Sequence, residues 1–158
     1  MYNISAVKQE IGEWILEVLS KENPIFGGLP PCPYAKKAWL EGRVAVHIVK
    51  DTTDYGLTEE NLDAGNDVIA YIFNPSTITP EELTNLTLEL NKTYPELLFL
   101  EDHPNEVEKV QDFVCNQGTY ACIFAAKRAG VLQAREHLKT TNYYDNWDEE
   151  YKQTVWSR

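Results

Sequence analysis

DVIAYIFNPSTITPEELTNLTLELNKTYPELLFL, residues 67–100, carries the clearest local signals for the fold. An apolar run from Asp67 to Phe73 predicts a buried strand that ends at Asn74-Pro75. Thr79-Pro80-Glu81-Glu82 matches a capping box with proline at the first helical position, so a helix is expected to begin there. The helix ends before Pro95, and residues 97–100 predict the next strand. The stretch is therefore a strand, a helix and a strand.

The flanking sequence extends this unit into a sheet. Residues 44–49 predict an earlier apolar strand, and the N-terminal segment has apolar residues at helical spacing. The fold class indicated is α/β, or α+β, with a small mostly parallel or mixed sheet of three to four strands and helices packed on it. Ligands of such sheets bind beyond the carboxyl ends of the strands. The polar residues expected at that edge are Lys50-Asp51, Asn74-Pro75 and Asp102-His103.

Several remaining segments complete the expected domain. Helices are expected over Thr58–Ala64 and from Asn105 to Val114. Residues 119–139 fit a strand at their start as well as a helix, and the helix is favoured. His47, inside an apolar strand, is expected to be a hydrogen-bonded core histidine. Residues 1–158 are expected to form a single globular domain, in which 140–158 is an aromatic and acidic C-terminal extension.

Charge and composition narrow the range of partners. The 158 residues have a formal net charge of −11, and the acidic excess lies after residue 43. A strongly acidic chain repels phosphate backbones, so nucleic acid is not expected as a partner. No apolar run is long enough for a membrane span, and no signal peptide is expected. Three cysteines without framework spacing indicate free thiols and a cytoplasmic location.

The best local candidate for chemistry is Cys32, in Leu29-Pro-Pro-Cys-Pro-Tyr-Ala-Lys-Lys37. Pro33 suits the first position of a short helix, so the thiol would face free N–H groups and the positive end of that helix. Lys36 and Lys37 add positive charge one turn later, and Tyr34 lies between. The alternative is a small apolar side chain packed under the loop. The functional interpretation makes Cys32 a nucleophile, a redox thiol or a metal ligand.

His103 and Asp102 are the second candidate pair. They follow a predicted strand directly, where a carboxylate can orient an imidazole or raise its pKa. The alternative is a surface turn. A shared site with Cys32 requires the two segments to meet at one edge of the sheet, and a purely parallel topology disfavours that meeting.

The order of these motifs resembles an uncharacterised bacterial domain family that has an N-terminal helix, a Leu-Cys-Pro-Phe-Ala motif and a later His-Pro pair. The matching segments are Pro31–Ala35, Asp102–Pro104, Asn116–Ala121 and Ile123–Lys127. Tyr34 replaces the Phe of the motif, Lys127 replaces an Arg, and prolines around Tyr120 are absent. The resemblance has no associated activity. It implies positions for substrate-binding residues, and with the lysines near Cys32 these are Tyr34, Lys36, Lys37, Asn116, Tyr120 and Lys127.

Three functions remain open from the sequence, so whether the protein is an enzyme is uncertain. The first is a thiol-dependent enzyme that uses Cys32 with help from His103 and Asp102. The second is a non-catalytic module whose acidic surface and aromatic tail bind a basic protein or peptide. The third is a metal-binding protein in which Cys32 and His103 share a divalent ion. Substrate and oligomeric state stay unassigned.

Overall fold

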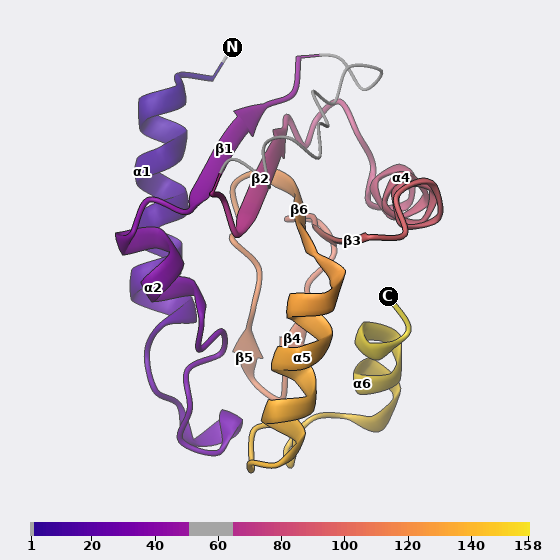
Figure 1. Ribbon diagram of the computed structural model, residues 1–158. Coiled ribbons are helices and arrows are strands. Elements are labelled where there is room, and N and C mark those ends of the chain that lie inside the picture. Colours follow the sequence, from indigo (N-terminus) through magenta and orange to yellow (C-terminus); the bar gives the residue numbers. More distant parts are fainter. Residues whose placement is uncertain (1, 51–64) are drawn as a thin grey trace.

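Four strands form one mixed sheet in the order β1-β2-β6-β3 (Figure 1). They are β1 (Val44–Ile48), β2 (Val68–Phe73), β3 (Leu97–Asp102) and β6 (Ala121–Lys127). β1 and β2 are parallel, and β6 runs antiparallel to both β2 and β3. β1, β2 and β3 therefore point the same way. The predicted fold class, an α/β fold with a mixed sheet and helices packed on it, is confirmed. The computed structural model describes residues 2–50 and 65–158, so Asp51 and the expected helix Thr58–Ala64 lie outside the described residues.

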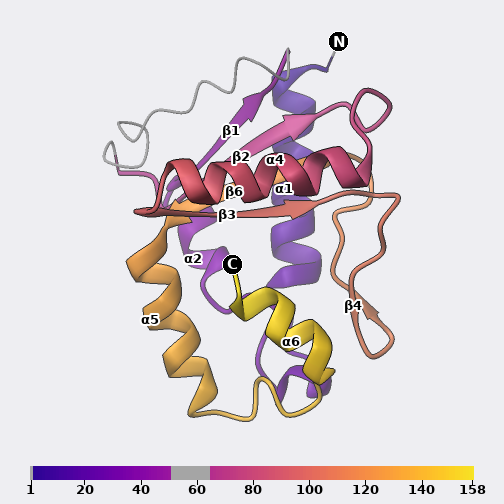
Figure 2. The same ribbon diagram turned by 90° about the vertical axis from the view of Figure 1, so that its right-hand side faces the viewer.

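Helices cover both faces of this sheet (Figures 1 and 2). On one face, α1 (Ile4–Trp14) continues into a π-helical turn, η1 (Ile15–Leu19), against which α2 (Ala35–Leu40) packs. On the other face lies α4 (Pro80–Thr93). The predicted capping box of α4 is present, because Thr79 Oγ1 accepts from the N–H of Glu82 at 3.2 Å and Thr79 N–H donates to the Glu82 carboxylate at 2.8 Å.

A third hydrophobic cluster lies beside the sheet rather than on it (Figure 1). It is enclosed by the 3₁₀ turn η2 (Pro24–Phe26), the hairpin of β4 (Lys109–Val110) and β5 (Phe113–Val114), α5 (Arg128–Lys139) and α6 (Glu149–Trp156). Phe26 is at its centre, with its ring centroid 5.3 Å from that of Tyr143. Because Tyr143 and Tyr144 are buried, the aromatic residues of the C-terminal segment form core instead of a surface platform.

The helix favoured over residues 119–139 is wrong in its first part. Residues 121–127 form β6, a central strand paired on both sides, and α5 begins only at Arg128. Most residues of this segment are buried, and pairing with β2 and β3 supplies hydrogen bonds to the backbone groups on both of its edges. These hydrogen bonds favour a strand although the spacing of the apolar residues also fits a helix.

Two further expectations are also wrong. The helix expected from Asn105 to Val114 is a loop with the short β4–β5 hairpin, closed by Gln111 at a positive φ of 52°. His47 is exposed, because β1 is an outer strand of the sheet and its residues are only partly buried.

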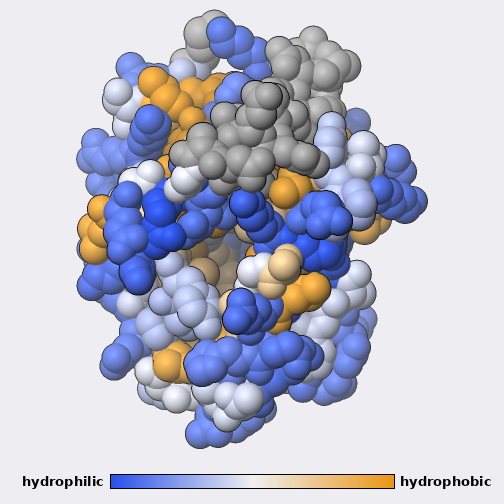
Figure 3. Space-filling model, in the orientation of Figure 1, coloured by the Kyte–Doolittle hydropathy of each residue, from blue (hydrophilic) through white to orange (hydrophobic). Residues whose placement is uncertain are grey.

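One face of the molecule is largely hydrophilic where it is described. Figure 3 shows that hydrophilic residues dominate the face seen in Figure 1 and that hydrophobic ones lie in small separate patches. None of the helices among residues 2–50 and 65–158 is long and apolar enough to cross a membrane.

Candidate functional site

Cys32 lies in a segment held by its backbone. Its N–H donates to Leu19 O at 2.9 Å, and its carbonyl accepts from Ala35 N at 3.3 Å. The Tyr143 hydroxyl donates to Pro31 O on the preceding residue. Burial raises the pKa of the Cys32 thiol, and hydrogen bonds from the backbone N–H groups of Tyr34 and Ala35 lower it by less. The helix begins at Ala35 and not at Pro33 as expected. The two N–H groups at its start favour the thiolate, but loss of solvation outweighs them.

Asp102 is the centre of a second, fully hydrogen-bonded network. Its carboxylate accepts from Asn116 Nδ2 at 2.6 Å and from the N–H of Gln117 at 2.8 Å. The same Asn116 amide group donates to His103 O at 3.1 Å and to Glu106 O at 3.0 Å, while Asn116 Oδ1 accepts from Glu108 N at 2.7 Å. Burial raises the pKa of Asp102 against the effect of these donors. Asp102 and Asn116 thus close the loop of residues 102–117, and we call this set the Asp102 network.

Both ring nitrogens of His103 are engaged. Nε2 donates to Ile78 O at 2.8 Å, and Nδ1 accepts from the N–H of Asn105 at 3.1 Å. The ring is 3% exposed, so it has no free nitrogen for a metal ion or a substrate. It joins the segment after β2 to the segment after β3. The carboxyl ends of these two strands therefore lie at the same edge of the sheet, as expected. His103 therefore links the two loops through the hydrogen bonds of its ring.

The other predicted residues fall into separate places. Tyr34, Lys36 and Lys37 are exposed beside Cys32. Tyr120 packs against Tyr2 on the α1 face, and its hydroxyl donates to Glu10. Lys127 is the last residue of β6 and pairs with Leu97 at the start of β3, so it lies at the end of the strands opposite to His103.

The hydrogen bonds of Cys32, His103 and Asp102 within the described part of the chain do not join Cys32 to either of the other two residues. Over residues 2–50 and 65–158, no group of three or more His, Cys, Asp or Glu side chains is placed to hold a metal ion. Cys32 and His103 are therefore not part of any such group among these residues.

A hollow of about 470 Å³ lies next to the loop that His103 fastens. The residues that line it are Pro80, Glu81, Thr84, Asn85, Asn105 and Glu106. Two of these lining residues, Glu81 and Glu106, are exposed acids from different segments, and neither forms an ion pair with a described residue. We call this hollow the acidic pocket.

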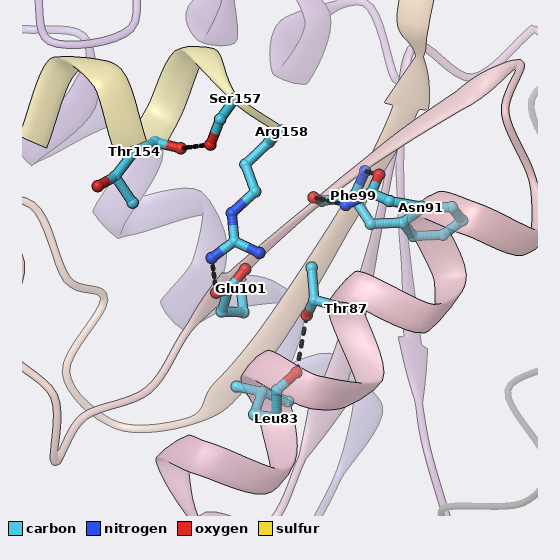
Figure 4. A network of polar contacts seen from close by, with 8 residues as sticks. All are labelled: Leu83, Thr87, Asn91, Phe99, Glu101, Thr154, Ser157 and Arg158. Atoms are coloured by element: carbon cyan, nitrogen blue, oxygen red, sulfur yellow. Dashed lines mark hydrogen bonds and ion pairs between the residues drawn. The ribbon is translucent and has the colours of Figure 1, made fainter.

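A second hollow, of about 480 Å³, has the opposite charge. It lies near the outer edge of β3, between α4 and α6, and Figure 4 shows contacts of three of its lining residues, Asn91, Ser157 and Arg158. The residues that line it are Leu88, Asn91, Lys92, Arg128, Thr154, Ser157 and Arg158. We call it the cationic pocket, since three of its lining residues are basic and none is acidic.

Sequence reasoning missed both pockets and one half-buried acid, Glu108. Burial and the negative charges of Asp102, Glu101 and Glu106 raise the pKa of Glu108 to about 7, against the opposing effect of Arg158. No local motif marks Glu108 or the pockets, because each depends on contacts between distant segments. The one available signal was the Glu101-Asp102-His103 run at a strand end, which pointed to the correct edge but not to the correct side chains.

Comparisons with known proteins add no constraint to this geometry. No family model, no curated protein and no solved structure significantly matches the chain.

Proposed function

We propose that this protein is a non-catalytic interaction module that binds a basic segment of a partner protein or peptide at the acidic pocket. The observation that carries the proposal is the pair of carboxylates, Glu81 and Glu106, that line one hollow without a cationic partner among the described residues. Two uncompensated carboxylates at one site attract a lysine or arginine side chain.

The local structure explains why these carboxylates stay available. The capping box of α4 uses Glu82, so the adjacent Glu81 is not needed to cap the helix. Glu106 lies in the loop that His103 and Asn116 hold, and its N–H donates to His103 O at 3.0 Å. Asp102 and His103 are in this view positioning residues, because they fix one wall of the pocket. The amides of Asn85 and Asn105 supply neutral acceptors for the same ligand group.

The net charge of −11 supports a basic partner, because it steers positively charged segments toward the protein at long range. The aromatic residues of the tail play no part in this version of the hypothesis, since they form the third cluster.

Calorimetric titration with a lysine hexapeptide and with its fully acetylated analogue tests the proposal. The double variant Glu81→Gln, Glu106→Gln should weaken binding of the lysine peptide by about five- to tenfold, as expected for two partly screened ion pairs. The matched control is Glu96→Gln, Glu150→Gln, which removes the same charge from exposed positions outside the pocket.

The control should change the affinity by less than about twofold at 0.15 M salt, where distant exposed charges are screened. Equal losses in the two double variants would mean that binding follows net charge alone, and the proposed site would be wrong. Equal binding of the acetylated peptide would contradict recognition of a cation.

Thiol chemistry at Cys32 is the second candidate function. The N–H groups of Tyr34 and Ala35 favour the thiolate, and this supports the idea. A partner that adds positive charge near the thiol would be needed to offset the effect of burial.

A further inference from the structure

One side of α4 connects the two pockets. Its residues on this side follow one another at intervals of three or four positions, which places them in a row along the helix. Those that line the acidic pocket are Glu81, Thr84 and Asn85, and those that line the cationic pocket are Leu88, Asn91 and Lys92. The buried residues Leu83 and Leu90 lie on the other side, toward the sheet. The two pockets therefore lie along the same side of α4.

Leu88 is the apolar residue of this row. Its side chain is 42% exposed, and it lies seven residues, or two helical turns, after Glu81. At about 1.5 Å per residue the two positions are about 10 Å apart along the helix axis. A single exposed leucine is common on a protein surface, but this one lies beside two acids without a cationic partner among the described residues. A ligand that reaches from Glu81 to Leu88 would bury apolar surface as well as pair with charge.

The polar groups around Leu88 are already engaged. Arg158 Nη2 donates to Glu101 Oε1 at 2.7 Å. The hydroxyl groups of Thr154 and Ser157 donate to main-chain oxygens of α6 at 3.0 and 2.8 Å. The part of the cationic pocket near Leu88 therefore offers a ligand an apolar contact more than a set of free hydrogen-bond donors.

Asn91 restricts how a partner segment can bind here. Its side-chain amide donates to Phe99 O at 3.0 Å and accepts from Phe99 N at 2.9 Å, so it occupies the outer edge of β3 at this point (Figure 4). A partner cannot add to the sheet as a further strand beside Phe99 while these bonds are present. Recognition along α4 must therefore use side chains.

Two amides of the acidic pocket favour an extended partner over a helical one. Asn85 and Asn105 are exposed, and neither side chain forms a hydrogen bond with any residue in the described ranges 2–50 and 65–158. A side-chain amide both donates and accepts, so it can bind the N–H and C=O groups of a peptide backbone. An extended segment has these groups free, whereas a helix has already paired them.

We propose that the basic partner segment binds along α4 in an extended conformation, with an apolar side chain about three residues from its lysine or arginine. The basic side chain lies at Glu81 and Glu106, and the apolar side chain contacts Leu88. An extended chain rises about 3.3 Å per residue, so three residues cover the distance of about 10 Å between Glu81 and Leu88. This inference rests on the proposed function and adds to it the apolar position and the spacing.

The test is a ¹⁵N NMR titration of the whole folded chain with three peptides. The first, Leu-Ser-Gly-Lys-Gly-Ser-Leu, has a leucine three residues from the lysine in both directions, so either chain direction satisfies the spacing. The second has serine in place of both leucines, and the third, Ser-Gly-Leu-Lys-Leu-Gly-Ser, has the same composition as the first with the leucines next to the lysine. The first peptide should shift the amides of Glu81 and Leu88 and bind about fivefold more tightly than the other two, as expected for a partly buried leucine.

Leu88→Ala should lower the affinity for the first peptide to that for the serine peptide and leave the serine peptide unaffected. The variant should fold normally, because Leu88 is exposed and alanine favours a helix. Leu132→Ala is the matched control, since Leu132 is a leucine of α5 that is 43% exposed and lines neither pocket. It should leave all three affinities unchanged within error.

The outcomes separate this inference from the proposed function. If the serine peptide binds, is weakened by the double variant Glu81→Gln, Glu106→Gln and gains nothing from the leucines, the proposed function stands and the apolar contact is wrong. If the double variant weakens no peptide, both are wrong. Equal losses in Leu88→Ala and Leu132→Ala would also overturn the inference. So would shifts of the Glu81 and Leu88 amides with protein concentration alone, because a second copy would then occupy this side of α4.

Discussion

Cys32 and Asp102, the two residues on which the predicted catalytic site depends, have opposite local surroundings. The Asp102 carboxylate accepts two hydrogen bonds that close a loop, so its polar atoms are part of the scaffold. The Cys32 segment is held by hydrogen bonds of its backbone to Leu19 and Tyr143, and these two bonds do not involve the thiol. A titratable residue after a strand can thus fasten a loop, and a thiol before a helix can remain protonated. Three predictions test this contrast, from the largest expected effect to the smallest.

Asp102→Ala should destabilise the fold by about 3 kcal/mol, because it leaves the N–H of Gln117 without its acceptor and removes one of the three acceptors of the Asn116 amide. Chemical denaturation of the variant and the parent protein measures the difference. Asp112→Ala, an exposed acid of the same loop, is the control and should change stability by less than about 0.5 kcal/mol. A loss as small as that of the control would mean that the Asp102 network does not support the loop, and a catalytic role for Asp102 would regain weight.

The second prediction concerns Glu108, which Asp102, Glu101, Glu106 and Arg158 surround. Its pKa is raised from 4.5 to about 7 in the folded protein, so the folded state binds the proton more tightly than the unfolded state does. The ionised Glu108 carboxylate destabilises the folded state. This effect is absent below pH 4.5, grows as the pH rises from 4.5 to about 7 and is complete above pH 7.

Glu108→Gln should therefore be about as stable as the parent protein at pH 4.5 and more stable by about 2 kcal/mol at pH 8. Denaturation at a series of pH values measures this difference. Glu96→Gln, an exposed acid, should show no such trend. A stability gap between Glu108→Gln and the parent that does not change with pH would show that Glu108 is ionised in both states.

Elements stabilised by local interactions were predictable from the sequence, and those stabilised by contacts between distant segments were less so. The start of α4 was predictable because Thr79, Pro80 and Glu82 lie within four residues of one another. The strand at 121–127 was not, because its hydrogen bonds come from β2 and β3, and its own spacing also fits a helix. Strand direction placed Asn74-Pro75 and Asp102-His103 at one edge, and in the structure His103 contacts Ile78, a few residues after Asn74-Pro75.

The candidate sites were less predictable than the fold. Cys32 precedes a short helix as expected, but its burial depends on contacts with distant segments, and burial decides the direction of its pKa shift. The hydrogen bonds of Arg128 follow no local pattern in the sequence, since its partners Asn91, Pro95 and Arg158 come from other segments.

The smallest expected effect is at Cys32 itself, in its rate of alkylation. Only the thiolate reacts, and burial raises the pKa of Cys32 above that of a free cysteine. Iodoacetamide at pH 7.5, followed by peptide mapping, should modify Cys32 more slowly than a cysteine in an unstructured peptide. Cys115 provides an internal standard, because burial and the charge of Glu108 raise its pKa to about 11, which leaves about a hundredfold less thiolate than a pKa of 9 would. If Cys32 reacts as fast as the peptide, the N–H groups of Tyr34 and Ala35 control the thiol more than burial does, and the thiol-dependent enzyme becomes the better hypothesis.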